Sequence, residues 1–393
     1  MIYIDVSVLT LATFLTGIQR VTREYTLRFL QDPELQGQVC LLYYNASKDS
    51  YFRIDSERYV DFYTHGRGRK ERMITKRKIA LDDFQKGDIW FEVDAGWMDR
   101  MKRSYLLPQL KKRGVRIIVH IYDVISVKYP QFCLERSAFN FQDYLGAYLL
   151  YADRIICNAQ ATAQDLRELG DAFGLTSVPE IRVVPLGSDF ARVRAEDMRP
   201  SDEAFAVVRA AMEKPFLLMI GTVEPRKNHR LLLDAYPELQ KMGYAIVFVG
   251  YLGWDMEDFA ERMRREPDYG KGIFHLTGAS DDVVHELYKK AKFLVFASYA
   301  EGFGLPIVEA LQRGTPVLAA DIPIYHEVGE GFCTWFLQDD PDSLVEKVRY
   351  YEANPKEYEA LRASLASYRG HSWEEAYTML RKELDLLPVG GEN

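Results

Sequence analysis

The sequence predicts an α/β protein with two doubly wound parallel sheets, each covered by helices on both faces. Short apolar runs alternate with helical stretches along almost the whole chain. Most of these runs lack an every-second-residue alternation, as expected for strands that are buried on both faces. The alternation stops at a polar, charged stretch near the middle of the chain and then restarts. We therefore expect two similar halves, each forming its own sheet.

The bulk composition agrees with two folded domains and excludes some classes of protein. The chain has 393 residues, of which 48% are hydrophobic, and this is enough for two large cores. A net charge of -8 argues against a dedicated nucleic-acid-binding protein, which carries a basic excess. The four cysteines are scattered singly, so we expect reduced thiols and neither a zinc site nor a disulfide framework.

The N-terminal apolar stretch, residues 6–15, could be mistaken for a secretory signal. No Lys or Arg precedes it and no small-residue cleavage site follows it, so we expect a buried strand at Ile2–Val6 instead. No run approaches the about 18 apolar residues that a transmembrane helix needs. These features predict a soluble, cytoplasmic protein.

The first domain is expected to span residues 1–190. Helices are predicted between its strands, for example at Gln19–Leu30 and Ala159–Leu169, so that right-handed crossovers join parallel strands. The predicted strands are Ile2–Val6, Val39–Tyr43, Ile89–Phe91, Arg116–His120, Arg154–Cys157 and Ile181–Val184.

The second domain is expected at residues 191–371, after a linker near 188–200. A last segment, 372–393, contains an amphipathic helix at 372–387, where Ser372 and Glu375 form a capping box. The predicted strands of the second domain are Phe216–Ile220, Ala245–Val249, Ile273–Leu276, Phe293–Ala297, Pro316–Ala319 and Thr334–Phe336.

A basic run, residues 65–78, carries seven Lys or Arg side chains. One interpretation is a solvated, mobile loop. The other is contact with an anionic acceptor or with lipid headgroups at a membrane surface.

The most informative strand-to-helix turn is SYAEGFGLPIVE, residues 298–309. Ligands of open α/β sheets bind at the carboxyl ends of strands, where helix N-termini offer free N–H groups. Glycines at 302 and 304 let the backbone approach a ligand, and the expected donors to a diphosphate or sugar are the N–H groups of Gly302, Phe303, Gly304 and Leu305. We expect Glu301 to bind hydroxyls of a transferred sugar and Glu309 to bind ribose hydroxyls. A plain helix start with a stabilising acidic residue is the alternative.

A second turn, GTVEPRKNH at residues 221–229, places two cations side by side. Gly221 begins the turn, and Arg226 with Lys227 would neutralise a diphosphate leaving group. That charge grows as the bond to the sugar breaks, so the effect stabilises the transition state. Cations at a helix N-terminus are disfavoured electrostatically, which favours an anionic ligand over simple surface charge.

A third turn, TGIQR at residues 16–20, lies in the other domain. Gly17 permits a tight turn and Arg20 lies at the start of a helix, so both are candidates for the donor site. A simple turn explains them equally well.

These motifs resemble the retaining glycosyltransferases of the GT-B fold, family GT4 (glycosyl transferases group 1). The runs EGFGLPIVEA, with seven residues between its two glutamates, and GTVEPRKNHRLLLDAY carry the resemblance, and ALQRGTPVLAADIPIYHEVG fits the family's style. TGIQRVTREY resembles the first-domain loop of bacterial mannosyltransferases that build O-antigen and other polysaccharides. The resemblance covers nearly the whole chain and is strongest over residues 216–330.

The resemblance implies two Rossmann-like domains facing a central cleft. The nucleotide sugar would bind mainly to the C-terminal domain, and the terminal helix would cross back to the first one. It also implies transfer with retention, the leaving phosphate acting as base, and no metal or other cofactor. Arg226 and Lys227 would replace the metal, Glu301 would contact the donor sugar, Glu309 the ribose, and the Gly17 loop the phosphates or the acceptor.

One departure from the family pattern lies in HIYDVISVKYP, residues 120–130. Many members carry a His-Asp pair after the fourth strand. Aligning on Asp123 puts Tyr122 where the histidine is usual, and His120 lies two residues earlier. Asp123 is therefore expected in the active site, His120 is either a sugar contact or a hydrogen-bonded strand-end histidine, and Trp97 is a candidate for the acceptor site.

The predicted function is transfer of a hexose, with mannose from GDP-mannose as one candidate, to a glycan or lipid-linked acceptor. A nucleotide-sugar 2-epimerase shares the fold, but the GFGLP loop between the two glutamates argues against it. An inactive protein that binds a nucleotide sugar or a partner enzyme is a further alternative, and it would predict damaged site residues. The four main site residues are all present in this sequence: Arg226, Lys227, Glu301 and Glu309.

Overall fold

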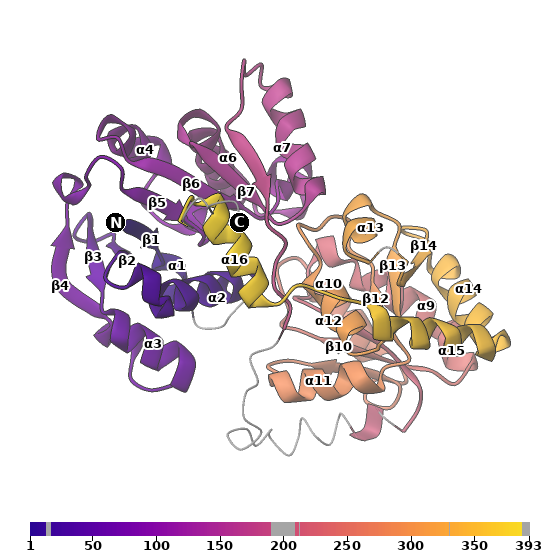
Figure 1. Ribbon diagram of the computed structural model, residues 1–393. Coiled ribbons are helices and arrows are strands. Elements are labelled where there is room, and N and C mark those ends of the chain that lie inside the picture. Colours follow the sequence, from indigo (N-terminus) through magenta and orange to yellow (C-terminus); the bar gives the residue numbers. More distant parts are fainter. Residues whose placement is uncertain (13–16, 190–208, 212, 330, 387–393) are drawn as a thin grey trace, which may run out of the picture. The chain divides into compact units, whose positions relative to one another are not determined.

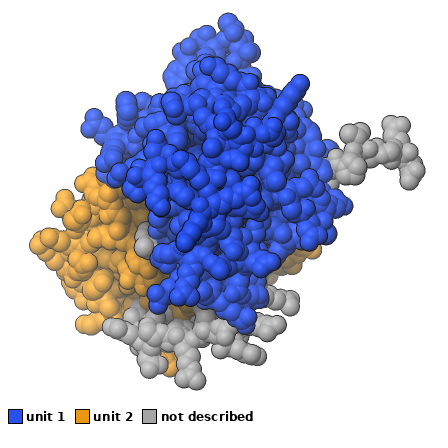
Figure 2. All heavy atoms as spheres, turned by 90° about the vertical axis from the view of Figure 1, so that its left-hand side faces the viewer, with its two compact units in different colours: residues 1–187, 371–393 blue, residues 188–370 orange. Residues whose placement is uncertain are grey.

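The computed structural model describes residues 1–12, 17–189, 209–211, 213–329 and 331–386 (Figure 1). The chain divides into two compact units, residues 1–187 with 371–393 and residues 188–370, which Figure 2 separates by colour. The predicted divisions after 190 and 371 lie close to these, and most of the predicted linker, residues 190–200, lies outside the described residues. Within the described residues, no helix is long and apolar enough to cross a membrane.

Unit 1 is built on an eight-stranded sheet with the order β4-β3-β2-β1-β5-β6-β7-β8. The five neighbouring pairs in the part β2-β1-β5-β6-β7-β8 of this order are all parallel. The strands are β1 Ile2–Asp5, β2 Val39–Asn45, β3 Ser50–Ile54, β4 Ile74–Ile79, β5 Ile89–Glu92, β6 Arg116–Ile121, β7 Arg154–Cys157 and β8 Glu180–Val183. The helices are α1 Ser7–Leu11, α2 Gly17–Gln31, α3 Ser56–His65, α4 Arg103–Lys112, α5 Ile125–Lys128, α6 Glu135–Tyr151 and α7 Gln160–Ala172.

The sequence-based expectation of an all-parallel first sheet was wrong at one edge. Strands β3 and β4 pair antiparallel with their neighbours, and neither was predicted. Residues 74–78 of the basic run belong to β4 rather than to a loop. Their continuous run of polar and charged residues resembles a surface loop, because an edge strand has solvent along one side.

Unit 2 contains a six-stranded parallel sheet with the order β11-β10-β9-β12-β13-β14. The strands are β9 Phe216–Ile220, β10 Ala245–Val249, β11 Ile273–Leu276, β12 Phe293–Phe296, β13 Val317–Ala320 and β14 Cys333–Phe336. The helices are α9 His229–Lys241, α10 Glu257–Arg265, α11 Asp281–Lys290, α12 Leu305–Gln312, α13 Pro323–Gly329, α14 Pro341–Ala353 and α15 Pro355–Ser364.

Each sheet has one point where the strand order reverses. In unit 1 the reversal lies between β1 and β5, and in unit 2 between β9 and β12. Loops that leave two such strands diverge to opposite sides, so a crevice forms at their carboxyl ends, where open α/β sheets bind ligands. This geometry points to the loops after β9 and β12 and to those after β1 and β5.

The last helix, α16 Trp373–Glu383, belongs to unit 1 although it follows unit 2 in the sequence. The predicted capping box between Ser372 and Glu375 is confirmed, with reciprocal bonds of 3.1 and 2.7 Å. Tyr377 donates to Asp32 at 2.7 Å. The helix ends before the predicted residue 387, which lies outside the described residues.

Candidate functional site

The loops after β9 and β12 form the candidate site in unit 2. Gly221, directly after β9, has φ 143°, and Gly304, directly before α12, has φ 93°. Both angles lie in the region that favours glycine, because a Cβ atom would strain the backbone there. Pro306 is the second residue of α12, where its missing N–H costs nothing. The two glycines thus allow sharp turns where strand gives way to helix.

The two predicted motifs of unit 2 meet at the side chain of Glu301. Arg226 Nη1 lies 3.0 Å from one carboxylate oxygen of Glu301, and Lys227 Nζ is hydrogen-bonded to the other. Arg226 also donates to the backbone oxygen of Ala300 at 2.6 Å. Its own backbone oxygen accepts from the N–H of Tyr299 at 2.8 Å. These contacts join the turn Pro225–Lys227 to the loop before α12.

The charges of this cluster nearly cancel, which the sequence did not predict. Glu224 pairs with Arg226 at 2.7 Å, so two carboxylates face two cations. Burial would raise the pKa of Glu301, but Arg226 and Lys227 together lower it to about 2, so the carboxylate is ionised at neutral pH. Burial lowers the pKa of Lys227, and Glu301 opposes that shift. Glu301 therefore engages both cations that sequence analysis assigned to a diphosphate.

Glu309 and the glycine-loop residues lie on or just before α12. Glu309, the fifth residue of the helix, is buried and accepts a hydrogen bond from Tyr288 at 3.0 Å. The loop residues Gly302 and Gly304 are buried, whereas Phe303 and Leu305 are half-buried. Tyr288 lies on α11 and was not predicted, because nothing in its local sequence marks it.

The predicted residues of unit 1 lie on separate elements. Gly17 is the exposed first residue of α2, and Arg20 is the half-buried fourth residue of that helix. Asp123 follows β6, and its carboxylate accepts from the N–H of Ile125 at 3.0 Å. Within unit 1, Trp97 packs edge-on against Phe141 with ring centroids 5.1 Å apart. Its side chain is half-buried against the hydrophobic core.

His120 and Tyr122 stack on each other inside unit 1, with ring centroids 4.5 Å apart. Tyr122 donates to the backbone oxygen of Val93 at 2.6 Å. The expectation of a hydrogen-bonded strand-end histidine was wrong, because neither ring nitrogen of His120 has a partner among the described residues. Burial lowers the pKa of His120 to about 3, so its ring is neutral. Both rings are buried, so neither is exposed to a sugar in this structure.

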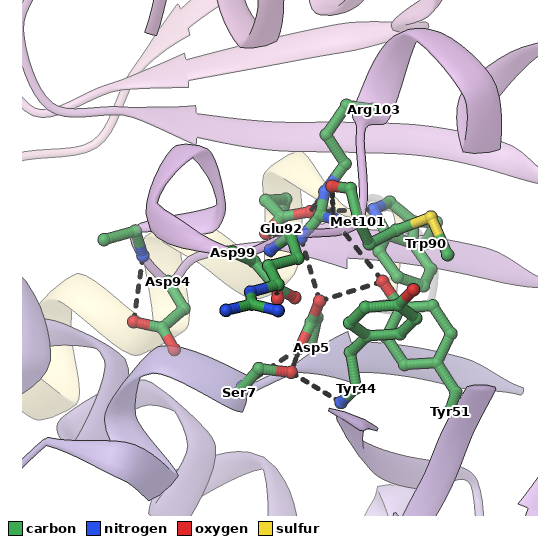
Figure 3. A network of polar contacts seen from close by, with 12 residues as sticks. Asp5, Ser7, Tyr44, Tyr51, Trp90, Glu92, Asp94, Asp99, Met101 and Arg103 are labelled. Carbon is green, nitrogen blue, oxygen red and sulfur yellow. Dashed lines mark hydrogen bonds and ion pairs between the residues drawn. The ribbon is translucent and has the colours of Figure 1, made fainter. Parts of the chain in front are cut away.

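A buried ionic network lies at the strand-order reversal of unit 1, and sequence analysis missed it (Figure 3). Arg103, at the start of α4, bonds both oxygens of Glu92 at 2.7 and 2.9 Å and Asp5 at 2.8 Å. It also donates to the backbone oxygen of Met101 at 2.9 Å. Asp5 ends β1 and Glu92 ends β5, so one guanidinium joins the two strands at this point. The signal in the sequence was the acidic spacing in EVDAGWMD after a buried strand.

Two further carboxyl groups border this network. Asp94 accepts from the N–H groups of Leu9 at 2.8 Å and of Ala95 at 2.9 Å. Burial raises the pKa of Asp94 to about 7, and burial followed by the charge of Asp5 raises the pKa of Asp99 to about 7. Gly96 packs so tightly that a Cβ there would lie 2.3 Å from a Glu92 oxygen.

Comparison with known proteins gives the family and the fold. Residues 200–366 match the family described as Glycosyl transferases group 1. The structure of Anabaena HepE in complex with UDP and glucose has a TM-score of 0.68 at 14% identity, over 98% of this chain and 99% of that one. The chain has the GT-B fold, and its residues 200–366 are similar to the group 1 glycosyltransferases. Sucrose-phosphate synthase from Thermosynechococcus elongatus has the same fold, with a TM-score of 0.55 at 19% identity over 76% of this chain and 72% of that one.

Several curated relatives of this GT-B chain are mannosyltransferases. The serotype-specific mannosyltransferase WbdA of Escherichia coli is 27% identical over 98% of this chain and 45% of its own length. O-antigen chain mannosyltransferase B of Escherichia coli is 34% identical over 42% of this chain and 39% of its own length. The chain spans about half the length of the WbdA relatives that it matches. The EGFGLPIVEA and GTVEPRKNH motifs lie within residues 200–366, the part of the chain that matches the group 1 family.

Proposed function

We propose that the chain is a retaining glycosyltransferase that moves a hexose from a nucleotide diphosphate sugar to a glycan or lipid-linked acceptor. The process would be cell-surface polysaccharide synthesis in the cytoplasm, at the inner face of the membrane. Mannose is the first candidate for the hexose, because WbdA and O-antigen chain mannosyltransferase B, to which the chain is similar, are mannosyltransferases. The observation that carries the proposal is the meeting of Arg226, Lys227 and Glu301 beside the Gly304 turn.

The two cations would receive the charge that develops on the leaving diphosphate. In the transferring state, the bond between the sugar C1 and the phosphate oxygen breaks, and the acceptor oxygen bonds C1 on the same face. The leaving phosphate takes the acceptor's proton, so no protein base is required. Arg226 and Lys227 would stabilise the diphosphate more as the bond breaks, which lowers the barrier rather than only binding the substrate.

Glu301 would act as an exchangeable partner in this scheme. While the donor is absent, its carboxylate neutralises two cations that are largely buried and would otherwise be costly to desolvate. When a diphosphate takes over those cations, the carboxylate is released toward the hydroxyls of the donor sugar. Glu309, Gly302, Phe303 and Leu305 keep the donor-binding roles that the sequence predicted for them, and Gly17, Arg20 and Asp123 remain candidates on unit 1.

The proposed enzyme needs no metal ion, because Arg226 and Lys227 carry the compensating charge. The described residues contain no group of three or more His, Cys, Asp or Glu side chains placed to hold a metal. We expect transfer to continue unchanged in EDTA, and strict dependence on a divalent ion would contradict the proposed role of the two cations. A peripheral contact between residues 65–78 and an anionic membrane surface is the remaining proposed partner.

Donor binding is tested by a thermal-shift panel of GDP-, UDP-, ADP- and dTDP-sugars. A true donor at 100 times its dissociation constant should stabilise the protein by about 2.7 kcal/mol. No shift with any nucleotide sugar, in a protein that unfolds cooperatively, would contradict the proposal.

The substitution Lys227→Ala tests the anion site directly. Loss of one positioned cation costs roughly 3 kcal/mol of transition-state stabilisation, so we expect turnover to fall by about 100-fold in a transfer assay. Lys241→Ala, which removes an exposed lysine from α9 of the same unit, is the matched control and should behave as wild type. Near-normal turnover of Lys227→Ala would remove the diphosphate role.

A further inference from the structure

The basic run at residues 65–78 divides into three parts with different surroundings. Lys70 donates to the backbone oxygens of Leu9 and Ala12 at the end of α1, so its charge is used within the fold. Lys76, Arg77 and Lys78 lie exposed on the edge strand β4. Basic side chains on an edge strand prevent pairing with other chains, which is a sufficient reason for them. The remaining arginines, at 67, 69 and 72, require another explanation.

These three arginines line a pocket of about 430 Å³ between the end of α3 and the turn before β4. The pocket is lined by Arg58, Asp61, Arg67, Gly68, Arg69, Arg72 and Met73. Four of these seven residues are arginines and one is a carboxylate. Arg67, Arg69 and Arg72 are exposed and form no ion pair within the described residues. Arg58 pairs with Asp55 at 3.6 Å, and Asp61 is the one carboxylate in the lining, so positive charge is in excess and the arrangement favours an anionic ligand.

The backbone holds this cluster in place. Arg58 donates to the backbone oxygen of Arg72 at 2.8 Å, which ties α3 to the turn Lys70–Arg72. Gly66 ends α3 in a left-handed conformation with φ 66°, and Gly68 has φ 92°. Two left-handed residues so close together turn the chain back on itself, which brings Arg67 and Arg69 to the same pocket as Arg72.

We propose that this arginine pocket binds a phosphate group, carried by a lipid headgroup or present as free phosphate. The planar guanidinium group offers two parallel N–H donors to a phosphate and stays charged at any physiological pH. A volume of about 430 Å³ fits a headgroup-sized ligand. The inference deepens the membrane contact proposed above by naming the residues and the chemical group. It does not require that the chain transfer sugars.

The test compares two variants that remove the same number of charges from the same run. Arg67→Gln/Arg69→Gln/Arg72→Gln empties the pocket of three guanidinium groups but leaves Arg58, which holds the backbone. Lys76→Gln/Arg77→Gln/Lys78→Gln removes three charges from β4 and leaves the pocket intact. Glutamine keeps most of each side-chain stem, and matching melting curves will show that both variants fold.

Binding is measured by sedimentation with phosphatidylcholine vesicles that contain or lack phosphatidylglycerol, and by calorimetric titration with inorganic phosphate. Each basic residue at an anionic surface contributes about 1 kcal/mol, or roughly fivefold, so the pocket variant should bind phosphatidylglycerol vesicles about 100-fold more weakly. The β4 variant should lose much less. Loss of vesicle binding alone identifies a lipid headgroup as the source, whereas an additional loss of a phosphate-binding event shows that free phosphate also occupies the pocket.

Two outcomes would overturn the proposal. Equal losses in both variants would mean that diffuse charge, rather than the pocket, attracts the anion. Absence of binding to both probes in the wild-type protein would mean that the pocket takes no phosphate. Lys227→Ala serves as an independent control, because it should lower turnover by about 100-fold and leave pocket binding intact. A failure of the transfer proposal is therefore distinguishable from a failure of the pocket proposal.

Discussion

A cluster of basic and carboxylate side chains lies at the reversal point of each sheet, and the two clusters differ in how far their cations are exposed to solvent. Arg103 has 1% of its side chain exposed and bonds two carboxylates and a backbone oxygen. Arg226 and Lys227 keep 17% and 14% of their side chains exposed. A guanidinium enclosed on all sides stabilises the fold, whereas partly exposed cations can exchange one anion for another. We therefore assign chemistry to the cluster of unit 2 and a structural role to Arg103.

The substitution Glu301→Gln should separate donor binding from transfer. Glu301 competes for the cations that would hold a diphosphate, so its neutral analogue should bind a nucleoside diphosphate more tightly and transfer sugar more slowly. Calorimetry and a transfer assay measure the two effects. Glu286→Gln, an exposed glutamate on α11, is the control. Equal losses of binding and transfer would contradict the assigned role.

The carboxyl group of Asp94 should make the stability of unit 1 depend on pH. Its folded pKa of about 7 exceeds the ordinary value of 3.8, so between these values the folded state holds a proton that the unfolded state has lost. Stability should therefore fall as pH rises from about 4 to about 7, and stay level above that window.

The expected loss from Asp94 is at most about 4 kcal/mol, and Asp94→Asn should remove this part of the pH dependence. Chemical denaturation of both proteins at several pH values measures it. Asp82→Asn, at an exposed site, should leave the curve unchanged. If wild type and Asp94→Asn show parallel curves between pH 4 and 7, the carboxyl group is not protonated there.

At the scale of elements, whether a strand could be predicted from the sequence depends on the elements that pack against it. The central strands of both sheets read as apolar runs because helices cover both faces, and these were predicted from the sequence. Strands β3 and β4 pair antiparallel at one edge of the first sheet, where Lys76, Arg77 and Lys78 of β4 are exposed. The charged sequence of β4 resembles a loop, so only its pairing with β3, which itself pairs with β2, reveals this strand. The loop after β5 likewise takes its shape from Glu92 and Arg103, which lie on other elements.

The turn at Gly96 should tolerate no side chain. An alanine Cβ would lie 2.3 Å from a Glu92 oxygen and 2.7 Å from Arg103, so Gly96→Ala must displace the ionic network. We expect a loss of about 3 kcal/mol in the free energy of unfolding, measured by denaturant titration. Gly146→Ala within α6 has no atom within 4 Å of its Cβ and should be neutral or slightly stabilising. If the two substitutions change the free energy of unfolding by similar amounts, the ionic network rearranges around the new side chain at little cost.

At the scale of the whole molecule, the chain leaves unit 1, builds unit 2 and returns to unit 1 with α16 (Figure 1). Trp373, Tyr377 and Leu380 are buried in unit 1, and Trp373 meets Tyr25 edge-on. Gly187 lies so close to the backbone of Trp373 that a Cβ would come within 2.5 Å. Helix α16 therefore contributes to the hydrophobic core of unit 1.

Truncation after Gly370 should destabilise unit 1 and spare unit 2. Burial of a large apolar side chain contributes about 1.5–3 kcal/mol, so losing Trp373, Tyr377 and Leu380 should cost several kcal/mol. Hydrogen exchange should become faster in α2, whereas nucleotide-sugar binding to unit 2 should persist. Unchanged exchange in unit 1 would show that α16 contributes little to its core.

Local patterns were enough to predict the α/β class, the two sheets, the capping box of α16 and the loops that carry Arg226, Lys227 and Glu301. These features depend on residues within one strand, helix or turn, where burial and backbone conformation constrain the residue types directly. Tertiary structure alone decided that Glu301 binds both cations, that Arg103 joins β1 to β5, that β3 and β4 extend the first sheet and that the ring of His120 has no hydrogen-bond partner among the described residues. Each of these depends on contacts between distant segments, and the local sequence around one partner does not specify which distant residue it meets.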